Sequence, residues 1–152
     1  MLQSFGLIRS NLLLQFIYKR PAFYAVQHMM GFFDDAVKPV GLLACESGSP
    51  RELTAAGFDK AGTPVALLWY SDQIPGDDLA WDKVDVTVKG VTFKDPVYVE
   101  LITGKVYELD KSAWRSADGN TTLTQLPVWD SPMMLAERDQ VALRKDGEAP
   151  KQ

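Results

Sequence analysis

From Glu52 onward, apolar and polar residues alternate with a period of two. In residues 84–88 valine occupies every second position, and polar residues fill the positions between. Successive side chains of a β-strand point to opposite faces, so this alternation predicts a strand with one buried and one wet face. Residues 97–101 repeat the pattern, and Thr103-Gly104 then predicts a turn into a hairpin partner at 105–109.

Short segments of this kind recur along the chain with turn residues between them. The seven predicted strands are residues 53–58, 64–70, 84–88, 97–101, 105–109, 121–125 and 133–137. Strands at roughly even spacing are typical of an antiparallel sandwich. We therefore expect a mainly β fold, a two-sheet antiparallel β-sandwich with an N-terminal α-helical segment.

The N-terminal segment has a different character, because its helical pattern is apolar nearly all round. Between Pro21 and Phe33 only Gln27 and His28 carry polar side chains. A surface helix normally shows one apolar stripe, so this helix needs cover on more than one side. The predicted division of the chain is 1–36 for the apolar segment, 37–51 for an irregular linker, 52–144 for the β-sandwich and 145–152 for a disordered tail.

Charge and composition exclude several classes of function. The 152 residues suit one domain, and their formal net charge of -4 argues against a nucleic-acid partner. Cys45 is the single cysteine, which leaves no intrachain disulfide and no thiolate metal site. His28 is the single histidine, and one histidine is too few for a histidine zinc site. We expect it to be a structural or partly exposed residue. We expect no metal and no cofactor.

The first residues carry no predicted secretory signal, since Arg9 interrupts the apolar run and no small-residue cleavage site follows. A second apolar run, at 12–17, is far shorter than a membrane span. We expect no membrane partner, and the compartment stays open.

The remaining residues raise the question of whether the chain acts on or binds carbohydrate. Glycoside hydrolysis needs two carboxylates flanking a sugar bond, whereas the pairs Asp34-Asp35 and Asp77-Asp78 are adjacent in sequence and suit a helix end and a turn. Exposed tryptophans could stack on sugar rings instead. Trp69 lies in an apolar run and is expected in the core, which leaves three candidates beside turns: Trp81, Trp114 and Trp129.

Three stretches carry a family resemblance. Residues 18–27 followed by 33–35 resemble the last helix of the (β/α)8 barrel of clan-A-type glycoside hydrolases. Residues 95–109 look like a strand–turn–strand of the β-sandwich that follows that barrel, and residues 126–136 are similar to its closing strand. The resemblance implies that the chain corresponds to the C-terminal part of such an enzyme.

The resemblance also implies what the chain does not do. The catalytic carboxylates of these hydrolases lie at the ends of barrel strands, which would all precede residue 1. No catalytic residue is carried over, and we expect a non-enzymatic accessory domain that supports a catalytic barrel. The alternative is a carbohydrate-binding module that holds polysaccharide through its exposed aromatics.

The helix is then expected to lack part of its cover. In a complete hydrolase the barrel would cover one face, so Met29 and Phe32 are predicted on an uncovered face, while Met30 and Phe33 dock on the sandwich. The partner is either the barrel or a second copy of the chain. The residues assigned to self-association are Met29, Phe32, Leu13 and Phe16.

Overall fold

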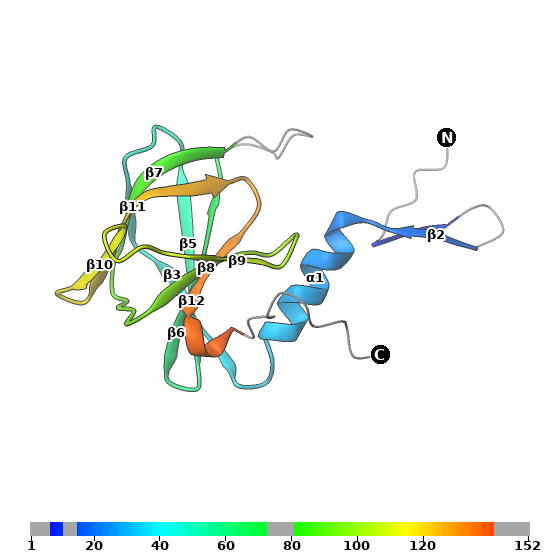
Figure 1. Cartoon of the computed structure of the whole chain (residues 1–152), viewed down its shortest axis with the longest axis horizontal. Helices are drawn as coiled ribbons and strands as arrows, with labels where there is room; N and C mark the ends of the chain where they lie inside the picture. Colours follow the sequence, from blue (N-terminus) through cyan, green and yellow to red (C-terminus); the bar gives the residue numbers. More distant parts are fainter. Residues whose placement is uncertain (1–6, 11–14, 73–80, 142–152) are drawn as a thin grey trace.

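The computed structural model describes residues 7–10, 15–72 and 81–141, and within them the chain forms two antiparallel sheets packed face to face (Figure 1). The six-stranded sheet has the order β3-β5-β6-β12-β8-β9, and the four-stranded sheet has the order β10-β11-β7-β4. The strands of the six-stranded sheet are β3 (Val37–Leu43), β5 (Leu53–Lys60), β6 (Thr63–Tyr70), β8 (Pro96–Glu100), β9 (Lys105–Glu108) and β12 (Met133–Glu137). Those of the four-stranded sheet are β4 (Cys45–Ser47), β7 (Trp81–Val88), β10 (Trp114–Ala117) and β11 (Asn120–Trp129). The predicted mainly β sandwich is confirmed.

The remaining elements lie at the two ends of the described chain. A small hairpin joins β1 (Ile8–Ser10) to β2 (Phe16–Lys19), and α1 (Pro21–Phe32) follows it. In Figure 1 the hairpin lies beyond the start of α1, on the side away from the two sheets. The short 3-10 helix η1 (Arg138–Gln140) follows β12.

The main core fills the space between the two sheets. Alternate residues of β7, including Val84 and Val86, face alternate residues of β6 and β12, including Leu68 and Leu135, and all four are almost fully buried. Tyr98 crosses this core, and its hydroxyl donates to the Pro127 carbonyl oxygen at 2.8 Å. Burial raises the pKa of the Tyr98 hydroxyl above its ordinary value, which keeps it neutral and able to donate.

A second core lies on the outer face of the six-stranded sheet. Val65, Val97 and Val99 point away from the first core and pack with Phe32 of α1. The central strands of this sheet are therefore covered on both faces, which explains their continuous burial. The four-stranded sheet carries no such layer among the described residues, and β7 alternates between buried and exposed positions at its centre.

The irregular linker predicted for 37–51 is wrong over most of its length, because β3 and β4 lie within it. Pro39 and Gly41 are the residues that suggested a linker. Proline is tolerated in β3 because it is an edge strand, paired with β5 alone. Gly41 has φ 120° and lies where the β3–β5 register shifts, a backbone position that favours glycine. The sheets therefore begin at Val37, ahead of the predicted position 52.

The prediction of which helix face docks is wrong for Met29, Met30 and Phe32, whereas Phe33 packs against the second core as predicted. Phe32 is 8% exposed, and Met29 packs against the second core, whereas Met30 is 73% exposed. His28 anchors the docked face, because its Nδ1 donates to the Leu101 carbonyl oxygen at 2.7 Å. A nearly uniform apolar helix gives no preferred stripe, so sequence could not decide the face.

Candidate functional site

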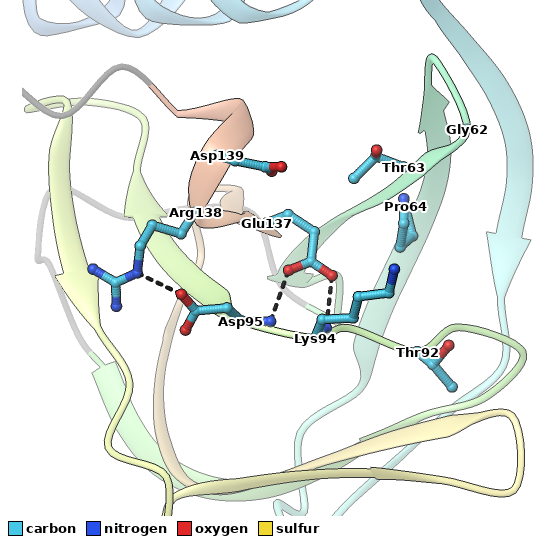
Figure 2. Close-up of a pocket in the computed structure, with 9 residues that line it drawn as sticks. All are labelled: Gly62, Thr63, Pro64, Thr92, Lys94, Asp95, Glu137, Arg138 and Asp139. Atoms are coloured by element: carbon cyan, nitrogen blue, oxygen red, sulfur yellow. Dashed lines mark hydrogen bonds and ion pairs between the residues drawn. The ribbon is translucent and has the colours of Figure 1, made fainter.

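Figure 2 shows a pocket of about 550 Å³ at one end of the sandwich. Three segments meet there: the β5–β6 turn, the connection before β8, and the end of β12 with η1. The lining residues are Gly62, Thr63, Pro64, Thr92, Lys94, Asp95, Glu137, Arg138 and Asp139. Hydroxyl, ammonium and carboxylate groups thus converge on one concave surface.

Glu137 lies at the centre of the pocket wall and is 8% exposed. Its Oε1 accepts the backbone N–H of Lys94 at 2.6 Å, and its Oε2 accepts that of Asp95 at 2.8 Å (Figure 2). Buried carboxylates need such donors to offset the loss of water. Glu137 therefore fixes the segment before β8 to the end of β12.

Arg138 fastens the same junction from the other side. Its Nε donates to Asp95 Oδ2 at 2.8 Å, and its Nη1 donates to Glu108 Oε1. The hydrogen bond to Glu108 and then that to Asp95 raise the pKa of the Arg138 guanidinium above its ordinary value. Within the described residues, three charged side chains of the pocket make no ion pair: Lys94, Asp139, and Glu137, whose oxygens accept backbone N–H groups instead.

The pocket does not present the two free carboxylates that glycoside hydrolysis uses. Asp95 is bound by Arg138, and both oxygens of Glu137 are engaged by backbone amides, which leaves Asp139. Lys94 and the hydroxyls of Thr63 and Thr92 can bind a polar molecule, but they supply no acid and base pair across a sugar bond.

A second candidate site lies on the four-stranded sheet, where two of the three predicted stacking residues meet. Trp81 of β7 pairs directly with Trp129 of β11 in the register of the sheet. Their ring centroids are 6.0 Å apart and the planes are inclined by 33°. Trp81 is 50% exposed, while Trp129 is partly buried against the main core.

The third predicted stacking residue lies elsewhere. Trp114 of β10 pairs with Leu123, which lies six positions before Trp129 on β11, a separation on the order of 20 Å along a strand. Its ring is partly buried against the main core. The structure thus brings Trp81 and Trp129 together and does not bring Trp114 to them.

An ionic cluster beside Trp129 escaped the sequence analysis. Arg51 Nη2 donates to Asp130 Oδ1 at 2.6 Å and to Asp72 Oδ1 at 2.9 Å, and its guanidinium lies 4.1 Å from the centroid of the Tyr70 ring. The hydrogen bond from Arg51 lowers the pKa of the Asp72 carboxyl. Positions 51, 72 and 130 are far apart in sequence, so no spacing could have revealed the cluster.

Two of the four residues assigned to self-association are not on an open surface, and the structure does not describe the side chains of the other two. Phe32 and Met29 pack in the second core. Leu13 lies outside the described residues, and for Phe16 the structure describes the backbone in β2 but not the side chain.

Of the two adjacent carboxylate pairs in the sequence, the structure describes one. Asp34 forms an ion pair with Lys60 at 3.2 Å beside the end of α1, and backbone hydrogen bonding from Ala36, with Lys60, lowers the pKa of Asp34. Asp77 and Asp78 lie outside the described residues. In the part of the chain that the structure describes, no three His, Cys, Asp or Glu side chains are grouped so as to hold a metal ion. No helix there is long and apolar enough to cross a membrane.

Comparison with known proteins adds little to these geometries. No protein-family model matches the sequence, and no curated protein matches it. Among solved structures, the chain is similar to alpha-L-fucosidase isoenzyme 2 from Paenibacillus thiaminolyticus, with 13% sequence identity and a TM-score of 0.42. The match covers 61% of this chain and 15% of the fucosidase chain.

Proposed function

We propose that this chain is a non-catalytic accessory β-sandwich domain of a glycoside hydrolase, and that its N-terminal part packs against a catalytic barrel. The observation that carries the proposal is the distribution of exposed apolar side chains. Of the eleven large hydrophobic residues that are exposed in the described part, nine lie between positions 7 and 42. The nine are Leu7, Ile8, Ile17, Tyr18, Tyr24, Val26, Met30, Val40 and Leu42.

These residues lie on the hairpin, on the outer side of α1 and on edge strand β3. The inner side of α1 is already satisfied by the second core, as Phe32 shows. A soluble monomer rarely exposes a contiguous apolar patch beyond a few hundred Å², and larger patches mark interaction sites. The family resemblance supplies the partner, because residues 18–27 followed by 33–35 resemble the last helix of a barrel.

We expect no glycoside hydrolysis by the purified chain. The physical reason is that two of the three carboxylates of the pocket are engaged, Glu137 by two backbone N–H groups and Asp95 by Arg138, which leaves Asp139 without a second free carboxylate. The measurement is product release from a panel of aryl glycosides and plant polysaccharides. Turnover above the buffer control that disappears in Asp139→Asn or Glu137→Gln would contradict the proposal.

We also expect the chain to self-associate when no barrel is present, since water contact with the exposed apolar side chains is unfavourable. Sedimentation velocity across the micromolar range should show a concentration-dependent shift toward dimer. The double variant Val26→Lys and Met30→Lys, at 37% and 73% exposure, should remain monomeric with an unchanged circular dichroism spectrum.

A control variant places a single lysine on the other sheet of the sandwich. Thr124→Lys changes an exposed residue of β11, in the sheet that α1 does not touch, and should associate as the unmodified chain does. A monomer at every concentration for the unmodified chain would argue against a docking surface on the N-terminal part.

A further inference from the structure

We propose that Trp81, with the partly buried Trp129 beside it, forms a binding platform for a linear oligosaccharide on the outer face of the four-stranded sheet, and that Trp81 is its exposed ring. This goes beyond the accessory role, because the platform lies on the other sheet from α1 and needs no barrel. The two indoles are cross-strand neighbours with centroids 6.0 Å apart, and the exposed fraction of Trp81 is 50%.

The face of the sheet follows from the alternation along β7. Val84, Val86 and Val88 are buried between the sheets, so the residues at odd positions point to the opposite side. Trp81, Lys83 and Asp85 are exposed there. Four positions along a strand span about 13 Å, so the strip from Trp81 to Asp85 is longer than one sugar ring.

Polar groups with unused hydrogen-bonding capacity flank the indoles along this strip. Asp85 Oδ1 accepts the backbone N–H of Gln125 at 2.8 Å, and its other carboxylate oxygen accepts no hydrogen bond from the described residues. Lys83 makes no ion pair within the described part of the chain. Hydroxyl groups both donate and accept, so they can pair with Lys83 and with Asp85 alike.

The chemistry of the strip favours a sugar over a protein. A pyranose ring has an apolar C–H face and a rim of hydroxyls, which matches an indole surface bordered by hydrogen-bonding side chains. A protein partner needs about 800 Å² on each side, whereas two indoles supply at most about 250 Å² each. Charged residues such as Lys83 and Asp85 are depleted at the centres of protein interfaces.

The test is titration of the full chain with a panel of neutral hexasaccharides: the β-1,4-linked gluco-, xylo- and manno-oligomers and the β-1,3-linked gluco-oligomer. Tryptophan fluorescence and calorimetry measure binding. We expect at least one oligomer to bind saturably, and Trp81→Ala to weaken its affinity about tenfold or more. The matched control is Tyr107→Ala, which removes an aromatic side chain of 38% exposure from edge strand β9 of the other sheet and should leave affinity unchanged.

A second measurement uses the unmodified chain and so does not depend on the folding of a variant. N-bromosuccinimide oxidises exposed indoles, and mass spectrometry of peptides locates the modified residue. The bound hexasaccharide should slow oxidation of Trp81 at least several-fold. The proposal is overturned if no hexasaccharide of the panel binds at millimolar concentration, or if binding leaves Trp81 unprotected and survives Trp81→Ala. Either result would leave the hydrolysis and association tests of the accessory role unaffected.

Discussion

Replacing Phe32 with alanine is expected to lower the free energy of unfolding by about 3 kcal/mol, the lower end of the usual cost for a buried phenylalanine. Phe32 is 8% exposed and joins α1 to the valines on the outer face of the six-stranded sheet. Its ring lies 5.4 Å from that of Phe33 and 4.3 Å from Lys60 Nζ. Truncation would remove these contacts and leave a cavity that the sheet cannot close.

Urea denaturation followed by circular dichroism measures this loss, and for a chain of this size the melting temperature should fall by about 6–12 °C. Met30→Ala is the matched control on the same helix. Met30 is 73% exposed, so its truncation should change stability by no more than about 0.5 kcal/mol. Equal effects of the two substitutions would contradict the docking of α1 through Phe32.

The strands with a clear period of two could be predicted from sequence. All seven predicted segments overlap observed strands, and residues 133–137 match β12 from end to end. The predicted strand 121–125 ends at Gln125, whereas β11 continues to Trp129 beyond a shift of register between Leu123 and Leu126. Gln125 has φ 54° at this irregularity, which a two-residue period cannot anticipate.

Five observed strands overlap no predicted segment: β1, β2, β3, β4 and β10. β3 is exposed at most of its positions, and β4 is three residues long. Their pairing with β5 and β7 stabilises them, and such long-range hydrogen bonding leaves no local signal. The docked face of α1 was also beyond prediction, since it depends on contacts with the valines of β6 and β8.

The candidate sites were predictable only in part. Exposure beside a turn singled out Trp81, Trp114 and Trp129, but the pairing of Trp81 with Trp129 depends on the irregular register of β11 against β7. The pocket around Glu137 gave no signal, because its lining comes from three segments distant in sequence. In the sequence, a glutamate at a strand end cannot be told from a solvated surface residue, because the two backbone N–H groups that bind it come from a distant segment.

Glu137→Ala is expected to lower the free energy of unfolding by about 3 kcal/mol. The substitution would remove two part-buried hydrogen bonds from the backbone N–H groups of Lys94 and Asp95 to a charged acceptor, and a hydrogen bond to a charged group contributes about 1.5–3 kcal/mol. Glu137→Gln keeps one carbonyl oxygen but places an amide N–H₂ against the other donor. Its loss should therefore be smaller than that of Glu137→Ala, at about 1–2 kcal/mol.

Asp139→Ala, two positions further on and exposed, is the matched control and should cost no more than about 0.5 kcal/mol. Hydrogen exchange gives a site-specific measurement, because the amides of Lys94 and Asp95 should exchange faster in Glu137→Ala and at intermediate rates in Glu137→Gln. Unchanged exchange at both amides, with a stability loss equal to that of Asp139→Ala, would show that Glu137 does not hold the segment before β8. A loss for Glu137→Gln as large as that for Glu137→Ala would instead assign the effect to the negative charge, since a neutral acceptor of the same shape would then have no value.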